Sequence, residues 1–264
     1  MKIQYASDLH LEFEENTEYL KENPLKVTGD ILILAGDIHV FGLPNFMENP
    51  FWDWASKNYK QVIIAYGNHE YYKTCDLGTM KDGYKYKIRD NVYYYYNCVI
   101  SIEDIDIIVS TLWSFIHKEN EHECVTGVND FHVIKYNGEV LTAEVFNDEH
   151  KKCLDFIKKS MQESKAKTKI IVTHHVPSIS LTAKEFQNSP MTDAFTVDLT
   201  DYIKTCGAKY WIFGHSHRNI CKKIGGTNCL CNQVGYVMDG ENETFSGDKC
   251  IDIKKGKDSN CNFI

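Results

Sequence analysis

Ile31-Leu32-Ile33-Leu34-Ala35-Gly36-Asp37 is the stretch of this chain that decides its fold. A continuous apolar run of this kind is typical of a strand that is buried on both faces of a sheet. Gly36 and Asp37 follow the run directly, so the sequence predicts a carboxylate at the carboxyl end of an interior strand. In α/β sheets, that edge is where loops converge on a ligand.

The same arrangement recurs elsewhere along the 264 residues. Short polar runs each follow a strand-like apolar stretch, and they are Asp8-Leu9-His10, Gly67-Asn68-His69-Glu70, His174-His175 and Gly214-His215-Ser216-His217. With Gly36-Asp37 they offer oxygen and nitrogen donors but no thiolate, which suits divalent Mn, Fe and Zn. The donors are too many for one ion, so they predict two divalent ions about 3.5–4 Å apart, an arrangement that serves displacement at phosphorus.

The spacing inside the runs supports this interpretation. Asp8 and His10 are two residues apart, so on an extended segment their side chains point the same way. His215 and His217 repeat the spacing, and Gly214 lets the backbone approach closely. One such pair alone is better explained as a turn beside an incidental histidine, but five runs in this order favour a metal site.

The order of the five runs resembles the calcineurin-like metallophosphoesterase family, whose pattern reads D-x-H, G-D, G-N-H-[D/E], H and G-H-x-H. The resemblance extends from Asp8 to His217. It implies an α/β fold that is a four-layer αββα sandwich, with two mixed sheets face to face and helices outside. It also implies a hydrolase that cleaves a phosphomonoester or phosphodiester through a metal-bound hydroxide, so the expected partner is a phosphate-ester substrate.

The resemblance also implies the metal ligands. One ion would be held by Asp8, His10, Asp37 and His217, and the other by Asp37, Asn68, His174 and His215. Asp37 would bridge the two ions with its two oxygens. His175 is the alternative to His174 and would otherwise orient a ligand. The imidazole content favours Mn, Fe or Zn over Mg, which prefers an all-oxygen shell.

Two further histidines are candidates for contact with the substrate. In the family, the histidine at the position of His69 does not bind a metal ion. It faces the substrate beside Asn68, and it protonates the leaving oxygen or steadies charge. We therefore expect Asp37 and His69 to be the catalytic residues. His39 repeats the i, i+2 spacing after Asp37, and it is either a contact to the substrate phosphate or an exposed loop histidine. Glu70 is expected to be structural.

Other functions fit the sequence less well. Protein Ser/Thr phosphatases of the superfamily carry an arginine in G-D-x-x-D-R-G, whereas this chain reads Gly36-Asp37-Ile38-His39-Val40. That difference weakens the protein-phosphatase alternative. A metal-bearing scaffold of the same fold is the second alternative, but scaffolds usually lose some ligands. The formal charge of −8 disfavours nucleic acid, which is bound mainly by neutralising phosphates.

Composition and patterning set the remaining expectations. The chain is 43% hydrophobic and 25% charged, as in globular proteins with a sizeable core. No apolar run approaches the ~18 residues of a membrane span, and Asp8 precedes any signal-like apolar region, so we expect a cytoplasmic protein without membrane contact. In that compartment the ten cysteines would be reduced thiols. The sequence makes no prediction of oligomeric state.

We expect one domain over residues 1–264, since no repeat or linker divides it. A loop-rich insertion around 114–141 is typical of an active-site lid, and its His117 and His132 either lie at the surface or line the pocket. An apolar stripe predicts a helix over 142–165 with His150 as a packing residue. Shorter helices are expected near 45–57 and 199–205. Strands are expected at 3–6, 31–35, 62–66, 93–102, 105–112, 170–173, 210–213, 229–234 and 250–253.

Overall fold

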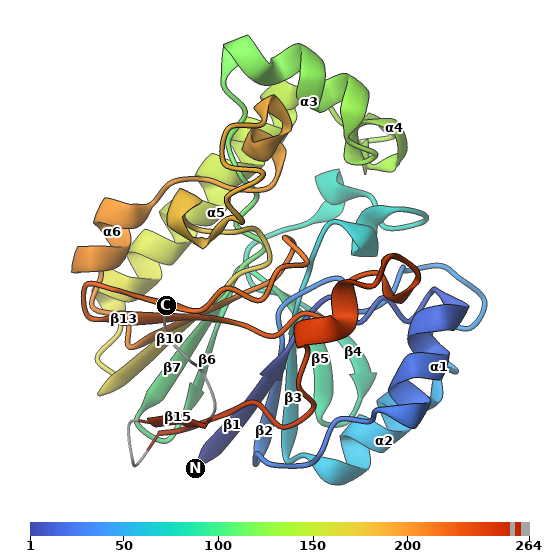
Figure 1. Ribbon diagram of the computed structural model, residues 1–264. Coiled ribbons are helices and arrows are strands. Elements are labelled where there is room, and N and C mark those ends of the chain that lie inside the picture. Colours follow the sequence, from blue (N-terminus) through green and yellow to red (C-terminus); the bar gives the residue numbers. More distant parts are fainter. Residues whose placement is uncertain (254–256, 260–264) are drawn as a thin grey trace.

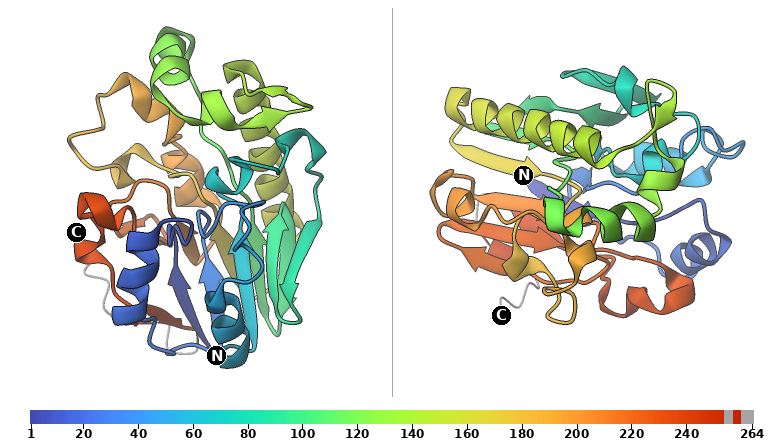
Figure 2. Two further views of the ribbon diagram at one scale, coloured as in Figure 1. Left: turned by 90° about the vertical axis from the view of Figure 1, so that its right-hand side faces the viewer. Right: turned by 90° about the horizontal axis from the view of Figure 1, so that it is seen from above.

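The computed structural model describes residues 1–253 and 257–259. Two mixed β-sheets lie face to face, and helices cover both outer sides (Figure 1). The view from above in Figure 2 shows the same layers end on, with the long helix outside the second sheet. The predicted four-layer αββα sandwich is confirmed.

The first sheet has seven strands in the order β15-β14-β1-β2-β3-β5-β4. Its centre is parallel and consists of β1 (Lys2–Ala6), β2 (Ile31–Leu34), β3 (Gln61–Ala65) and β5 (Val92–Tyr96). Antiparallel strands flank it, namely β4 (Tyr84–Arg89), β14 (Cys250–Asp252) and β15 (Lys257–Ser259).

The second sheet has six strands in the order β12-β13-β11-β10-β7-β6. Its parallel strands are β7 (Ile105–Val109), β10 (Thr168–Val172), β11 (Tyr210–Phe213) and β13 (Thr227–Cys231). Antiparallel β6 (Cys98–Ile102) and β12 (Lys222–Ile224) lie at its edges. A parallel bridge between Ser7 and Gln233 joins the two sheets just past the end of β1. The carboxyl ends of both sets of parallel strands therefore meet at one edge of the sandwich.

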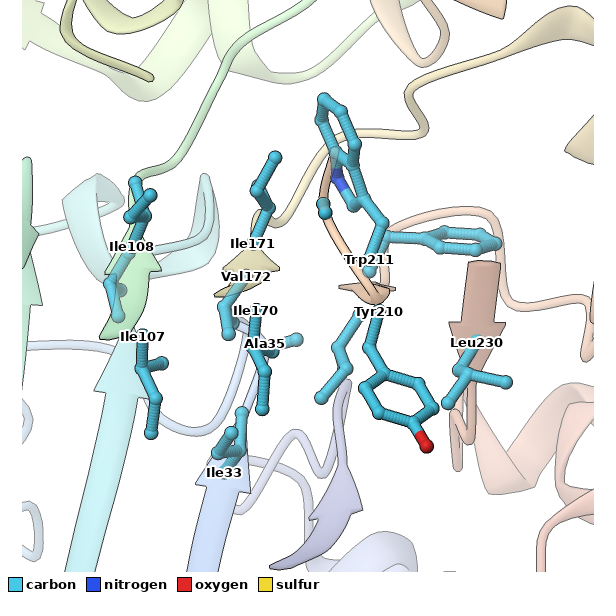
Figure 3. Close-up of a cluster of buried hydrophobic side chains, with 14 of the residues drawn as sticks. Ile33, Ala35, Ile107, Ile108, Ile170, Ile171, Val172, Tyr210, Trp211 and Leu230 are labelled. Atoms are coloured by element: carbon cyan, nitrogen blue, oxygen red, sulfur yellow. The ribbon is translucent and has the colours of Figure 1, made fainter. Parts of the chain in front are cut away.

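The apolar runs of these strands are buried on both faces, as predicted. In Figure 3, Ile107, Ile170 and Tyr210 lie on the side of β2, while Ile171 and Trp211 point to the opposite side. All five are completely buried. This alternation fills the space between the sheets and also the space under the outer helices, so the strand ends are held on a closely packed support.

Helices cover the sheets largely where the sequence predicts them. The long one is α5 (Ala143–Glu163), which the Thr142 hydroxyl caps by accepting from the Val145 N–H at 3.3 Å. The shorter ones are α2 (Pro50–Asn58) and α6 (Thr200–Thr205). His150 is buried, with Nδ1 3.0 Å from the Trp113 carbonyl oxygen, which confirms its packing role.

Several elements differ from the prediction, among them the edge strands β4 and β12, which were not predicted. The expected strand over 93–102 is wrong, because Asn97 adopts a left-handed φ of 45° and the chain passes from β5 in one sheet to β6 in the other. Helix α1 (Glu14–Glu22) was not predicted. Of its residues only Asn16 is buried, so the helix has no apolar stripe for sequence reasoning to detect.

The segment 114–141 is more regular than the expected loop. It contains α3 (Glu121–Gly127), α4 (Asp130–Val133) and a hairpin of β8 (Lys135–Tyr136) with β9 (Glu139–Val140). These elements are short and carry their apolar residues singly, so they leave no periodic pattern. Figure 1 shows α3 and α4 above the carboxyl edge of the sheets.

No helix among the described residues is long and apolar enough to cross a lipid bilayer. Most cysteines within the described part of the chain are buried. The buried ones pack as small apolar side chains. Cys261 lies outside the described residues.

Candidate metal centre

The predicted ligands lie together at the shared edge of the two sheets. Asp8 and His10 follow β1, Asp37 follows β2 and Asn68 follows β3, all in the first sheet; His174 follows β10 and His215 and His217 follow β11, in the second. Except for His217, whose side chain is 11% exposed, these residues are buried. The face-to-face packing of the sheets therefore brings together donors that are as many as 209 positions apart in the chain.

The backbone at this edge is unusual. Left-handed φ values occur at Asp8 (52°), His10 (46°), Asp37 (53°), His215 (73°) and His217 (48°). The expectation that Asp8 and His10 share an extended segment is therefore wrong, although their side chains do converge. Such conformations cost about 1–3 kcal/mol each in non-glycine residues and are typical of functional sites. Their clustering at the predicted ligands supports a functional role for this edge.

The glycines of the motifs make room for these side chains. A Cβ atom at Gly67 would collide with the carboxylate of Asp37, and one at Gly36 would collide with the imidazole of His174. Gly36 also has a φ of +90°. Glycine is therefore required at both positions because the side chains of Asp37 and His174 approach the backbone closely. At Gly36 the left-handed backbone is a second reason.

One group of donors contains Asp8, His10 and His217. His217 Nε2 lies 3.3 Å from Asp8 Oδ1, and His10 Nε2 lies 3.2 Å from His217 Nε2. Asp37 Oδ2 is 3.9 Å from His10 Nε2. The imidazole nitrogens point at one spot between the carboxylates, as they would around a shared cation.

A second group contains Asp37, His174 and His215. His174 Nε2 lies 3.3 Å from Asp37 Oδ2 and 3.0 Å from Asn68 Oδ1. His215 Nε2 is buried and has no hydrogen-bond partner among the described residues. Asp37 thus lies within reach of both groups, the position required of a bridging carboxylate.

The hydrogen bonds of the histidines fit metal binding. Each of His10, His174 and His217 directs Nδ1 to an oxygen, from Glu12 at 3.0 Å, Ala35 at 2.9 Å and Glu241 at 2.6 Å respectively. An Nδ1–H donor leaves Nε2 with its lone pair toward the centre, which is how outer partners orient metal-binding histidines. Asp8 Oδ2 and His215 Nε2 are buried, and neither has a hydrogen-bond partner within the described part of the chain; a cation would satisfy both. The residues present therefore fit two divalent ions.

Without cations, protons balance the carboxylates. Burial alone would lower the pKa of His174, but the Asp37 carboxylate raises it to about 9. Burial likewise opposes protonation of His217, yet hydrogen bonds to Asp8 and Glu241 raise its pKa to about 10. Burial lowers the pKa of His215, aided by neighbouring histidines. The centre is thus arranged for positive charge.

His69 lies beside the proposed ligands, and with His10 and Asp37 it forms a third group of possible metal donors. Its Nε2 is 4.0 Å from Asp37 Oδ2 and 3.0 Å from the Tyr236 hydroxyl, and the ring stacks on Tyr72 at 4.1 Å. Burial lowers its pKa, but Asp37 and Glu12 together raise it above the usual value. His69 also lines the cavity in front of the centre, so it can hold a proton facing a bound molecule.

Glu12 is a residue that sequence reasoning missed. Its Oε1 lies 3.0 Å from Nδ1 of His10 and 3.0 Å from Nδ1 of His69. Burial would raise its pKa, but hydrogen bonds from the two histidines lower it to about 2. The carboxylate therefore positions a candidate ligand and the candidate acid together. The only feature of the sequence that points to Glu12 is its position two residues after His10.

Glu70 is structural, as expected. Its carboxylate accepts from the backbone N–H groups of Asp37 at 3.1 Å, Ile38 at 2.9 Å and Gly67 at 2.7 Å. The Tyr94 hydroxyl donates to it as well, at 3.3 Å. These bonds tie the loop after β2 to the loop after β3.

The segment 114–141 contributes a residue that the sequence did not single out. Asp130 of α4 accepts from Asn68 Nδ2 at 2.8 Å and from the Tyr72 hydroxyl at 2.7 Å. These contacts fix the Asn68 amide with its oxygen toward His174. Asp130 is buried, whereas its neighbour His132 is exposed.

The other candidate histidines lie elsewhere. His39 has no exposed surface and is not among the described residues that line the cavity in front of the centre, so the exposed-loop interpretation is wrong and contact with substrate is not supported. Its ring packs on Phe46 instead, at 5.3 Å. His175 is buried against Trp113 at 5.1 Å, outside the donor groups that include His174. His117 and His132 lie at the surface.

A cavity of about 390 Å³ opens in front of the centre. Its inner end is formed by Asp37, Asn68, His69, His215 and His217. Its outer walls come from 127–130 and 182–196, with Arg218 and Glu241 at one side. Sequence reasoning missed Arg218, which directly follows a predicted ligand.

The comparisons with known proteins agree with this geometry. Residues 1–219 match the family model described as calcineurin-like phosphoesterase. The chain belongs to this family. A relative described as "Uncharacterized protein L509", from Acanthamoeba polyphaga mimivirus, is 28% identical over 275 residues, covering 95% of this chain and 96% of that protein.

Among solved structures, the phosphopantetheinyl hydrolase of Mycobacterium tuberculosis superposes with a TM-score of 0.65 at 16% identity. The superposition covers 92% of each chain. At this identity the likeness shows the shared fold alone. The chain thus combines membership of this family with buried His and Asp clusters that are consistent with a dinuclear metal site.

Proposed function

We propose that this protein is a metal-dependent phosphoesterase that hydrolyses a phosphomonoester or phosphodiester at a dinuclear centre. The observation that carries the proposal is the position of Asp37, which lies between two groups of buried donors at the inner end of a cavity. Membership of the phosphoesterase family supports the same activity.

The proposed ligand sets follow the two donor groups. Asp8, His10, Asp37 and His217 would hold one ion, and Asp37, Asn68, His174 and His215 would hold the other. The nitrogen content of both sets favours Mn, Fe or Zn over Mg. When bound, the ions would polarise the phosphate and lower the pKa of water enough for attack at phosphorus.

The chain's own residues supply the proton for the leaving group. As a water oxygen bonds to phosphorus and the ester P–O bond breaks, His69 donates the proton on Nε2 to the departing oxygen, and a proton from the water restores it. Glu12 accepts from Nδ1 of the same ring at 3.0 Å and holds Nε2 toward the cavity. A positioned general acid contributes about 10²–10⁴-fold to rate.

The role of a metal-bearing scaffold is less well supported. A scaffold needs neither a complete set of donors nor a histidine held beside it in an open cavity. Here every predicted ligand position has a donor at the shared edge, and His69 lines the cavity with Nδ1 fixed by Glu12.

The experiment compares metal-stripped and metal-loaded protein on aryl and alkyl phosphate esters. EDTA should abolish hydrolysis, and Mn should restore it at least as well as Mg. His69→Asn should lower kcat for the alkyl ester more than for 4-nitrophenyl phosphate, whose leaving group needs no proton, while two ions stay bound. His117→Asn, at an exposed position, is the matched control. Loss of an ion in His69→Asn would refute the general-acid role, and no hydrolysis of any ester by loaded protein would refute the function.

A further inference from the structure

The outer part of the cavity is apolar. Val128, Phe186, Met191 and Phe195 line it beyond the candidate metal ligands. Phe195 stacks on the ring of His215 at 4.8 Å, so the apolar wall begins directly at the metal centre. The cavity therefore changes from charged donors to apolar side chains along its length.

Two residues of this wall are unusually exposed. Phe186 is 43% exposed and Met191 is 42% exposed, which places them among the large apolar side chains that the described part of the fold leaves in solvent. Exposed apolar surface gathered at a cavity commonly marks a ligand-binding site. A bound apolar group would remove this surface from water.

The hydroxyl groups of the three threonines in the wall are already used within the wall. Thr182 and Thr196 hydrogen-bond to each other at 2.8 Å through their Oγ1 atoms. Thr192 donates its hydroxyl to the Phe186 carbonyl oxygen. These threonines consequently present their methyl groups as the available surface, which adds to the apolar character.

The charges of the cavity disfavour a second phosphate. Among the described residues that line the cavity, Arg218 is the only lysine or arginine. Its guanidinium lies 3.6 Å from Glu241 and 3.7 Å from Glu185. It also covers the ring of Phe186 at 5.7 Å. Asp130 adds a carboxyl group to the lining. Among the described lining residues, an anionic group beyond the metal centre would meet no uncompensated lysine or arginine and two carboxyl groups, those of Asp130 and Glu241.

We propose that the group esterified to phosphate in the substrate is an uncharged and mainly apolar organic group, held between Phe186, Met191 and Phe195. This inference rests on the proposed phosphoesterase function and adds the substrate class. The substrate is then a phosphate ester of an apolar alcohol, with its phosphate at the metal centre. Nucleoside di- and triphosphates and nucleic acids are excluded by the same charges.

The test measures binding separately from hydrolysis. Non-hydrolysable n-alkylphosphonates from methyl to octyl are titrated into metal-loaded protein by calorimetry, and phosphate release is measured from the matching n-alkyl phosphates. Burial of a methylene is worth about two- to fourfold in affinity, so Kd should fall by that factor per carbon until the cavity is filled. The heat-capacity change should become more negative along the series.

A pair of methionine variants controls for general effects. Met191→Ala should reduce the methyl-to-octyl ratio of Kd values at least about fivefold, because it removes part of the wall. Met47→Ala is the matched control: this methionine is 40% exposed and does not line the cavity, so the ratio should stay unchanged.

The outcomes separate the two proposals. Hydrolysis with a flat Kd series, or competition by ADP stronger than by octylphosphonate, would overturn the apolar substrate class and leave the phosphoesterase function standing. A Kd that falls with chain length without hydrolysis of any ester would support the apolar site and overturn the function. An equal loss of the ratio in Met47→Ala and Met191→Ala would overturn the assigned wall.

Discussion

Two histidines of the candidate metal centre hold protons in the metal-free protein, and divalent ions must displace them. His174 beside Asp37 has a pKa raised to about 9, and His217 between Asp8 and Glu241 has a pKa raised to about 10. Both rings are therefore almost fully protonated at neutral pH. A histidine binds a metal ion only in its neutral form, so metal binding must release these protons.

The number of protons follows from the pKa values. Burial lowers the pKa of His10 and of His215, so these proposed ligands are already neutral and release none. Loading both sites near pH 7.5 should then release about two protons from the ligands, one each from His174 and His217, besides any proton that a metal-bound water would lose. Since each displaced proton adds a factor of ten per pH unit, the apparent affinity of each site should rise about tenfold between pH 6.5 and 7.5.

The assay is calorimetric titration of Mn or Zn into stripped protein, in buffers that differ in their ionisation enthalpy. The dependence of the measured heat on the buffer gives the number of protons. His217→Gln should lower that number by about one, whereas His117→Gln, at an exposed position outside the proposed ligand sets, should leave it unchanged. Binding of two ions without any proton release would refute the reasoning, as would an unchanged number in His217→Gln.

Three further predictions concern the same centre. Asp37→Ala should weaken the binding of both ions, and metal analysis that finds either site at full affinity would contradict the bridging role. Glu70→Gln places an amide NH₂ against buried backbone N–H groups, so it should lower the free energy of unfolding by about 1–3 kcal/mol, or Tm by roughly 2–10 °C; a Tm within 1 °C of the unsubstituted protein, on the order of experimental error, would argue against it. In stripped protein the raised pKa values of His174 and His217 stabilise the fold fully below about pH 6.5, and this contribution is lost as pH rises through about 9 and 10. Thermal melts should show Tm of the stripped protein falling over that range, and a rising Tm would be inconsistent with the two ion pairs.

Much of the fold was predictable because its signals are local. Continuous apolar runs such as Ile31–Leu34 mark strands buried on both faces, and α5 shows itself by a cap at Thr142 and a continuous stripe. The break at Asn97 was not predictable, since the residues on either side are equally suited to strands and only the second sheet decides where the chain turns. Helix α1 was missed because Asn16 is its only buried residue.

The candidate site likewise has features that the sequence predicts and features that it does not. The types of donor and their places after strands could be predicted, because residue identity and strand ends are properties of the sequence. The partners that orient them could not: Glu12 is shared by His10 and His69, and Asp130 reaches Asn68 from an insertion 62 positions away. No spacing rule connects such pairs, because their contact depends on how separate loops fold over the edge.

By itself, then, the sequence determined the family, the α/β layers and the inventory of nitrogen and oxygen donors at strand ends. The tertiary structure alone decided that the proposed ligands gather about Asp37, that His39 is buried away from the cavity, and that apolar side chains such as Phe186 line its outer half. The physical reason is that the distances at the shared edge are set by packing. Two sheets closed on a common core hold distant loops in contact, with enough stability to maintain left-handed backbone at residues such as Asp8 and Asp37.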